Sequence, residues 1–356
     1  MPPEESQTAP IHVTRNRKSL TVDVHCHVLT ADVERLVASS PEKQAEGAAQ
    51  LRMYGAESVE YNRTLFAGLL PQLTDVKERL RRMDAMGVDI QVISPSPNQY
   101  YYWADVDLAK QIVATQNEHI ASVRAAHPDR LRGLGNVALQ HAELSVQQLT
   151  DCIGKFGLCG VEISSVVNGL ELSDARFERF WAKAEELGCL VFIHPFGTSL
   201  GERVNRYYMG NIIGQPIETT IALSHLIFGG VLDRYPGLKI CAAHGGGYLP
   251  SYVGRSDHGF EVRPEARKMK HKPSEYLERI YFDSLVYTLE GLRHLIEQVG
   301  VAHVLLGTDY PFDMGAYEPE KLIASVPGLA DKDREQILGG NAARLLGIDA
   351  RAAVKA

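Results

Sequence analysis

The chain has 356 residues, of which 45% are hydrophobic and 23% are charged, as in an ordinary globular protein. Its formal net charge of −7 argues against nucleic acid or an anionic membrane surface as a general partner. A small anionic substrate remains compatible, because only local positive charge has to attract it. No apolar run approaches the roughly 20 residues that cross a bilayer, so we expect no membrane span. Five cysteines without a CxxC pair indicate reduced thiols and a cytoplasmic location.

The first expected elements flank a segment without clear periodicity. Residues 1–18 are expected to form a polar, flexible tail, which lacks the apolar stretch of a secretory signal. A first strand is expected over 19–25. Residues 29–71 are mixed in character and partly helical around 31–38, so we expect an insertion on a loop. Residues 75–86 have helical spacing and end at Gly87, a residue typical of a helix C-cap.

Strands and helices then alternate to the end of the chain. Short apolar runs predict strands at 88–94, 131–139, 159–164, 189–194, 238–244, 280–284 and 302–309. Helical spacing predicts helices at 104–127, 144–156, 173–187, 216–228 and 289–299. The strand candidates are continuously apolar rather than alternating, which is typical of parallel strands buried on both faces.

The number of strands separates two α/β folds. A doubly wound sheet would give the same local pattern. Eight strand candidates, with reactive residues at their carboxyl ends, favour a (β/α)8 TIM barrel, because the active sites of such barrels lie at that face. No low-complexity linker divides the chain, so we expect a single domain over 19–350, with insertions at 29–71 and 197–214 near the mouth of the barrel.

Four residues at strand ends predict a metal site. His25 and His27 form an H-C-H motif, and alternation along a strand points both imidazoles to the same side. Two ordinary histidines near a surface would explain that motif alone equally well. His194 closes the fifth strand and Asp309 the eighth, which favours convergence of all four on one ion. Imidazole and carboxylate ligands together suit zinc, and manganese or iron are the alternatives.

His244 closes the sixth strand and has a different expected role. A fifth protein ligand would leave little room for chemistry, whereas a catalytic zinc usually keeps a position open for water. Three glycines, 245–247, follow and allow a close approach of the chain. We therefore expect His244 to be the general acid and base, and a fifth metal ligand is the alternative.

These motifs resemble the amidohydrolase superfamily, and within it the branch of α-amino-β-carboxymuconate-ε-semialdehyde decarboxylase and related aromatic-acid decarboxylases. The resemblance runs from about Leu20 to Ile348. It rests on H-C-H, the H-P at His194, A-H-G-G-G around His244, G-T-D-Y-P-F around Asp309, R-M-D-A-M-G-V-D-I-Q-V, G-R-S-D-H, K-P-S-E-Y-L-E-R and G-N-A-A-R-L-L. It implies one zinc ion on His25, His27, His194 and Asp309, His244 as acid and base, and no organic cofactor.

The resemblance also implies two arginines that bind substrate carboxylates. They would be Arg63, in the insertion, and Arg255, which would reach across the interface of a homodimer. A solvated surface arginine is the alternative for Arg63, and a local ion pair with Asp257 is the alternative for Arg255. The family has a tryptophan–aspartate pair where this chain has Phe196 and Gly197.

Other residues are expected near the mouth of the barrel. We expect Phe196 and Phe312, which stand beside the metal motifs, to contact the substrate. Glu162, at the end of the fourth strand, is a further carboxylate there or a structural partner. The aromatic residues 100–103 wall the pocket or pack in the core.

The sequence thus predicts a metal-dependent, non-oxidative carbon–carbon lyase. A metal ion would polarise a substrate oxygen, and His244 would move the proton that carbon receives. The substrate would be an unsaturated or aromatic carboxylic acid, such as a carboxymuconate semialdehyde or a hydroxybenzoate. A hydrolase or hydratase with the same ligands is the nearest alternative. A catalytically silent barrel that binds a ligand or partner is another.

Overall fold

The computed structural model describes residues 19–349, so the expected tail at 1–18 and the expected last domain residue, 350, lie outside the described residues. Eight parallel strands form one sheet whose order follows the sequence. They are β1 (Val22–Val28), β2 (Ile90–Pro95), β3 (Leu131–Gly135), β4 (Gly160–Ser164), β7 (Leu190–His194), β8 (Lys239–Ala242), β9 (Ile280–Asp283) and β10 (Val304–Leu305). A separate antiparallel pair, β5 (Val166–Val167) and β6 (Leu170–Glu171), follows β4.

Backbone hydrogen bonds join the first strand to the segment around the last strand. The amide of Val24 donates to the carbonyl of Leu306 at 2.9 Å, and the amide of His27 donates to the carbonyl of Tyr310 at 2.8 Å. The amide of Asp309 donates in turn to the carbonyl of His25 at 2.8 Å. These bonds close the sheet, and the expected (β/α)8 barrel is confirmed.

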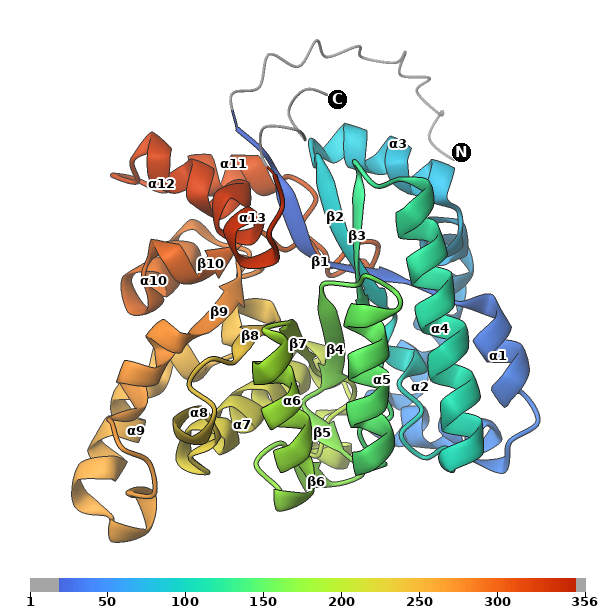
Figure 1. The fold of residues 1–356 in the computed structure, drawn as a ribbon, viewed down its shortest axis with the longest axis horizontal. Coiled ribbons are helices and arrows are strands. Elements are labelled where there is room, and N and C mark those ends of the chain that lie inside the picture. Colours follow the sequence, from blue (N-terminus) through green and yellow to red (C-terminus); the bar gives the residue numbers. More distant parts are fainter. Residues whose placement is uncertain (1–18, 350–356) are drawn as a thin grey trace.

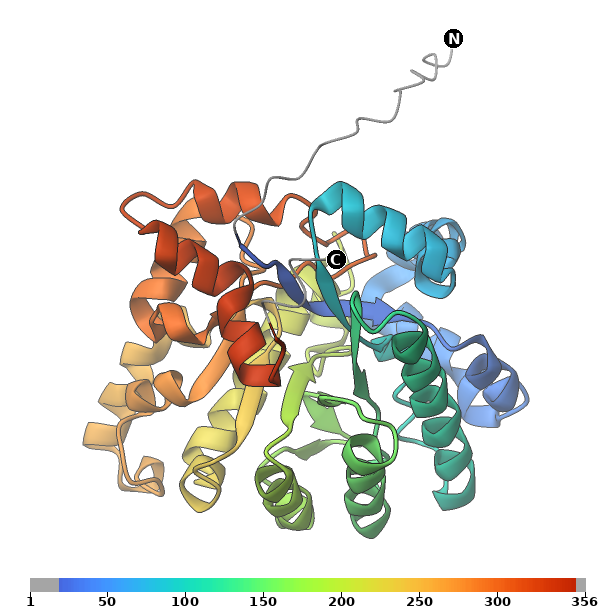
Figure 2. The same cartoon turned by 45° about the horizontal axis from the view of Figure 1, so that its top comes forward.

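Helices surround the strands, which lie at the centre of the molecule in Figures 1 and 2. They are α1 (Ala31–Val37), α2 (Pro41–Thr74), α3 (Val76–Met86), α4 (Val106–Ala126), α5 (Ala142–Gly154), α6 (Glu178–Leu187), α7 (Gln215–Phe228), α8 (Val231–Arg234), α9 (Leu249–Val262), α10 (Leu289–Val299), α11 (Pro319–Ala324), α12 (Asp331–Glu335) and α13 (Asn341–Leu346). In the part of the chain described, no helix is long and apolar enough to cross a membrane.

The barrel has an inner and an outer apolar layer. The inner layer includes Val24 of β1, Val92 of β2 and Phe192 of β7. The outer layer packs strand residues against the helices, with Trp181 of α6 among its largest fully buried side chains. Burying a side chain such as Phe192 contributes about 1.5–3 kcal/mol relative to leaving it exposed. Packing of the strands in these two layers holds their carboxyl ends in place.

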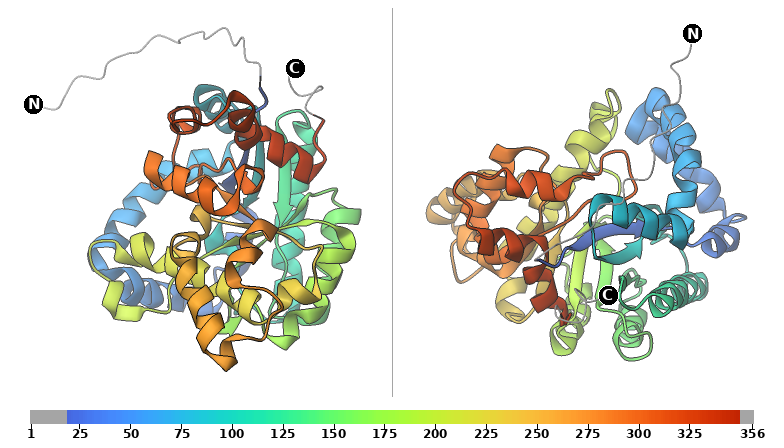
Figure 3. Two further views of the ribbon diagram at one scale, coloured as in Figure 1. Left: turned by 90° about the vertical axis from the view of Figure 1, so that its left-hand side faces the viewer. Right: turned by 90° about the horizontal axis from the view of Figure 1, so that it is seen from above.

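The expected loop insertion at 29–71 is instead helical. It contains α1 and most of α2, which continues to Thr74 and is interrupted at Gly55, where φ is 76° and ψ is 163°. Only Leu69 and Leu73 of α2 are buried, so the segment lacks the apolar stripe that reveals a helix in a sequence. In Figure 3 the blue α2 lies beside the yellow-green segment with η3 (Gly201–Val204) and the π-helix η4 (Gly210–Gly214), which α2 contacts.

Candidate metal centre

The four side chains expected to bind metal meet at the carboxyl ends of the barrel strands. His25 and His27 lie on β1, His194 ends β7 and Asp309 follows β10. One ligand atom from each residue lies within 4.8 Å of the others. The Nε2 atoms of His25 and His27 are 3.4 and 3.3 Å from the same oxygen, Oδ1 of Asp309. The structure therefore brings the whole set to one point.

A β-bulge in β1 determines which way the first ligand points. Asp23 and Cys26 lie three positions apart, whereas their partners on β2 lie two apart, so β1 has one extra residue. A bulge of this kind changes the face to which the following residues point. His25 faces inward, with its ring centroid 5.0 Å from that of Phe192, while Cys26 packs in the outer layer. His27 then shares the inward face of His25, as strand alternation predicts, with ring centroids 5.1 Å apart.

The converging ligand atoms are buried and form no hydrogen bonds within residues 19–349. They are Nε2 of His25, Nε2 of His27, one ring nitrogen of His194 and Oδ1 of Asp309; the other ring nitrogen of His194 also has no hydrogen bond there. A buried polar atom without a partner costs about 1–3 kcal/mol, and native proteins rarely leave several of them together. A divalent cation bound by imidazole and carboxylate would satisfy these atoms. The residues present therefore fit a metal ion.

The electrostatics of the cluster also favour a cation. Burial and the neighbouring His27 and His25 hold the pKa of His194 well below its usual range, so its imidazole is neutral. Burial opposes ionisation of Asp309, but the neighbouring His25, His244 and His27 together outweigh it and hold the pKa of that carboxyl well below its usual range. Burial also lowers the pKa of His25, yet Asp309 and Asp283 raise it well above the ordinary value. The ionised carboxylate of Asp309 thus lies among the imidazoles of the cluster, and its negative charge attracts a cation to this point.

The other ring nitrogens of the β1 histidines contact the protein. The Nδ1 atom of His25 lies 2.6 Å from Oδ2 of Asp283, and Nδ1 of His27 lies 3.2 Å from the carbonyl of Pro95. Such outer partners orient a ligating imidazole and direct its other nitrogen to the metal. Asp283 was not among the residues expected from the sequence. Its position as the last residue of β9 is the signal that could have identified it.

His244 lies beside the four-residue cluster. Its Nε2 atom is 3.7 Å from Oδ2 of Asp309, and its ring centroid is 5.0 Å from that of His194. Its Nδ1 atom forms no hydrogen bond with a described residue, and 12% of its side chain is exposed. His244 therefore has a neighbouring carboxylate and a partly exposed side chain, but it is not among the residues that line the pocket in front of the cluster.

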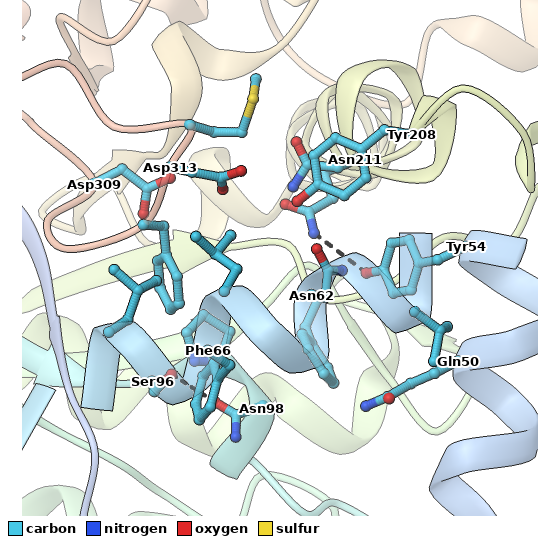
Figure 4. A pocket seen from close by; sticks show the side chains of 18 of the residues that line it. Gln50, Tyr54, Asn62, Phe66, Ser96, Asn98, Tyr208, Asn211, Asp309 and Asp313 are labelled. Atoms are coloured by element: carbon cyan, nitrogen blue, oxygen red, sulfur yellow. Dashed lines mark hydrogen bonds between the residues drawn. The ribbon is translucent and has the colours of Figure 1, made fainter. Parts of the chain in front are cut away.

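A pocket of about 470 Å³ opens onto the cluster, with His194 and Asp309 in its wall. In Figure 4, Tyr54 and Asn62 of α2 lie near Tyr208 and Asn211, and Asp309 and Asp313 lie apart from them at the upper left of the view. The remaining lining residues are Gln50, Val59, Arg63, Leu65, Phe66, Leu69, Ser96, Pro97, Asn98, Pro195, Phe196, Gln215, Phe312, Asp313 and Met314. The segment expected to be a loop insertion thus builds one wall of the pocket.

Three of the four residues expected to bind substrate line this pocket. The ring of Phe312 lies 5.4 Å from that of His27, and Phe196 is 41% exposed. Arg63 is there as well, with 76% of its side chain exposed and an ion pair to Glu60 at 2.7 Å. Arg255 does not line the pocket. It lies on α9, on a separate surface hollow.

Glu162, Tyr100 and Tyr102 lie behind the cluster rather than in the pocket wall, whereas Tyr101 and Trp103 bond to Glu34 of α1 and Glu46 of α2. The hydroxyl of Tyr100 donates to Oε1 of Glu162 at 2.6 Å, and Oε2 of Glu162 lies 3.7 Å from Nδ1 of His27. Burial raises the pKa of Glu162, and burial with the adjacent Glu162 raises the pKa of Tyr100 well above its ordinary value. Glu162 thus contacts one ligand from behind, as a structural partner does.

Comparisons with known proteins were consistent with this site. A family model described as "Amidohydrolase" matches residues 22–348. The 2-amino-3-carboxymuconate-6-semialdehyde decarboxylase of Dictyostelium discoideum is 36% identical over 344 residues, which cover 93% of this chain and 93% of that protein. The solved 5-carboxyvanillate decarboxylase of Sphingomonas paucimobilis is 28% identical, with a TM-score of 0.82, covering 93% of this chain and 100% of that chain. A 5-carboxyvanillate decarboxylase from Novosphingobium aromaticivorans, solved with manganese, is 20% identical with a TM-score of 0.81, covering 93% and 96%.

Proposed function

We propose that this chain, which belongs to the amidohydrolase family and is a metal-dependent, non-oxidative decarboxylase, acts on an unsaturated or aromatic carboxylic acid. Examples of such acids are a carboxymuconate semialdehyde and a hydroxybenzoate. One observation carries the proposal. Buried ligand atoms without hydrogen bonds converge at the inner end of a pocket of about 470 Å³, and His244 lies beside them.

We propose that His25, His27, His194 and Asp309 hold one zinc ion. Three imidazoles and a carboxylate support zinc, whereas the manganese in the Novosphingobium enzyme supports the alternative metal. When bound, the ion would polarise a substrate oxygen and so draw electron density away from the carbon that loses CO2. No organic cofactor is required by this scheme.

His244 is proposed to supply the proton. When the bond between the substrate carbon and its carboxylate breaks, CO2 leaves and the electron pair stays on that carbon. His244, protonated, would donate its proton there and would regain one from solvent through its partly exposed side chain. An imidazole suits this exchange because its ordinary pKa, about 6.5, is close to neutral pH.

The pocket supports a planar substrate with more than one polar group. Phe196 and Phe312 provide aromatic surface, and Arg63 can reach a carboxylate that is retained in the product if it leaves Glu60. Asn62 and Asn211 can both donate and accept hydrogen bonds, which suits hydroxyl, amino or aldehyde groups.

Release of CO2 tests the proposal. The zinc-loaded enzyme should release CO2 from at least one member of a panel of carboxymuconate semialdehydes and hydroxybenzoates, and His244→Ala should not. Mass spectrometry of the product separates the alternatives. Loss of CO2 supports a decarboxylase, whereas gain of water without CO2 would support a hydrolase or hydratase and would contradict the proposal.

The oligomeric state, the domain organisation and the location of the protein are also proposed. We propose that the enzyme is a homodimer, that residues 19–350 form one domain, and that the protein is cytoplasmic. The five free cysteines, four of them buried, support the location because they suit a reducing compartment. The exposed position of Arg255 supports the dimer.

A further inference from the structure

One carboxylate lies between the metal cluster and His244. Asp283, the last residue of β9, is completely buried and does not line the pocket. Its Oδ2 atom contacts Nδ1 of His25 at 2.6 Å and accepts the backbone amide of His244 at 3.0 Å. Its Oδ1 atom accepts the backbone amides of Gly245 at 2.8 Å and Leu285 at 3.1 Å. Asp283 therefore uses both oxygens on protein groups and faces neither solvent nor substrate.

The first contact determines the tautomer of a ligand. Both oxygens of Asp283 already accept backbone amides, so the carboxylate is an acceptor and Nδ1 of His25 carries the proton in the 2.6 Å hydrogen bond. With Nδ1 occupied in this way, the nitrogen that His25 can offer to a metal is Nε2, which faces Asp309 and has no hydrogen bond with a described residue.

The second pair of contacts holds a strained turn. His244 has a φ of 55°, and Gly245 follows with a φ of 59°. A residue other than glycine in this region costs about 1–3 kcal/mol and persists only where its surroundings impose it. Successive backbone amides in such a turn form a concave anion site. The carboxylate of Asp283 fills that site, so it is the group that imposes the conformation of His244.

We propose that Asp283 is a positioning residue that couples the metal ligand His25 to the proton donor His244. One carboxylate orients the imidazole of the first and the backbone of the second. Loss of the carboxylate should therefore change metal affinity and proton transfer together. This inference rests on the proposed metal site and on the proposed role of His244.

The test compares zinc binding by wild type, Asp283→Asn and the control Asp233→Asn. An asparagine amide has a similar shape but only one acceptor oxygen, so it cannot accept both the His25 proton and the amides of Gly245 and Leu285. The Asp233 side chain is 9% exposed and accepts the hydroxyl of Tyr276 at 2.7 Å and the amide of Lys270 at 2.8 Å, away from the metal cluster. Competition with a chelator should show zinc binding weakened roughly 10- to 100-fold in Asp283→Asn. Asp233→Asn should bind zinc as wild type does.

Two further measurements test the His244 side of the coupling. At saturating zinc, Asp283→Asn should show faster hydrogen exchange at the amides of His244 and Gly245 than wild type. Its kcat should fall by about tenfold or more, because a displaced acid loses part of the 10²- to 10⁴-fold contribution of proton transfer. Unchanged zinc affinity in a folded Asp283→Asn protein, or an equal loss in Asp233→Asn, would overturn the proposal.

A measurement on the wild type covers the case in which Asp283→Asn does not fold. Nitrogen NMR of histidine-labelled, zinc-loaded enzyme should show the His25 proton on Nδ1, and an unprotonated or metal-bound Nδ1 would overturn the inference. If the wild type binds no zinc, the proposed function fails. If the wild type binds zinc but the variants and the tautomer disagree with expectation, only the role of Asp283 fails.

Discussion

The ring nitrogens of His194 are the atoms that most directly support a metal ion at the mouth of the barrel. Both ring nitrogens of His194 are buried without a hydrogen bond from the described residues, although the ring lies among other polar side chains. A histidine that only filled the core would have one nitrogen hydrogen-bonded. A metal ion at the centre of the cluster would satisfy one of these two nitrogens, so the arrangement at His194 fits a metal ligand better than a residue that only fills the core.

Removal of one ligand should empty the site. Wild type should hold about one ion per chain after dialysis, and His25→Ala or Asp309→Ala should hold almost none, because a site with four protein ligands loses affinity with each one. His225→Ala is the control, since this histidine is 44% exposed and lies outside the cluster. Elemental analysis measures the content, and full occupancy in both ligand variants would refute the assignment.

His244→Ala separates an acid from a ligand. We expect this variant to retain its metal, while kcat falls roughly 100-fold or more because the proposed proton donor is lost. Metal analysis and CO2 release are measured on the same preparation. Loss of the metal together with activity would instead make His244 a fifth ligand.

Arg63→Ala should weaken substrate binding more than the chemical step. A charge-assisted hydrogen bond contributes about 1.5–3 kcal/mol, and the exposure of Arg63 places the effect at the lower end, about a tenfold rise in KM. Arg52→Ala, on the same helix and outside the pocket wall, should leave KM unchanged. An unchanged KM in Arg63→Ala would favour the alternative of an ordinary surface arginine.

The sequence predicts the site residues to different degrees. His194 and Asp309 can be recognised because a polar residue after a buried strand requires a partner. Asp283 also ends a strand, but a lone carboxylate there has many structural explanations, and its role depends on contacts made across 258 residues of chain to His25. The bulge before Cys26 depends on pairing with β2, so no local pattern reveals it.

At the scale of elements, α2 connects the fold to substrate recognition. Its second part carries Asn62, Arg63 and Phe66 into the pocket wall, and the break at Gly55 sets the direction of that part. A Cβ atom on Gly55 would lie 2.0 Å from the backbone oxygen of Asn205. The helix therefore needs glycine there both for its positive φ and for the close approach to η3.

Gly55→Ala should consequently lower stability and raise KM. The backbone conformation of Gly55, which is almost exclusive to glycine, costs about 1–3 kcal/mol in alanine, and the clash with Asn205 must in addition displace α2. Gly47→Ala is the control, because no atom lies within 4 Å of its added Cβ, and it should raise helix stability by up to about 1 kcal/mol. Urea unfolding and steady-state kinetics check both variants, and a wild-type KM in Gly55→Ala would contradict this role of the kink.

Apolar spacing predicts the elements of the barrel but not the helix at its mouth. The strand at 280–284 and the helix at 289–299 were predicted almost to the residue, because their apolar spacing reflects burial on the barrel. The helical character of 41–74 was missed, because this helix covers the mouth of the barrel and buries little of its own surface. Its conformation follows from what it contacts rather than from its composition.

At the scale of the whole molecule, the surface around Arg255 is where the contact of the proposed homodimer would lie. Arg255 lies on α9, exposed, beside Tyr252, which is 67% exposed. Asp257, its expected local partner, instead accepts the amide and hydroxyl of Ser274 at 2.9 and 2.7 Å. No ion pair of Arg255 occurs among residues 19–349. An exposed tyrosine and a free guanidinium are typical of an interface.

Mixing two inactive variants tests whether Arg255 serves the pocket of a neighbouring chain. Arg255→Ala and His244→Ala should each be nearly inactive, since one lacks a substrate contact and the other the proton donor. In a heterodimer, the pocket with an intact His244 receives Arg255 from the other chain, so one of its two sites is complete. Equal mixing should form about half heterodimers and restore roughly a quarter of wild-type activity, with tagged chains confirming exchange. A mixture that exchanges chains but stays inactive would show that Arg255 acts within its own chain or not at all. Arg267→Ala mixed with His244→Ala controls for nonspecific effects, because the Arg267 side chain is already bonded to the carbonyl of Phe260 at 2.7 Å.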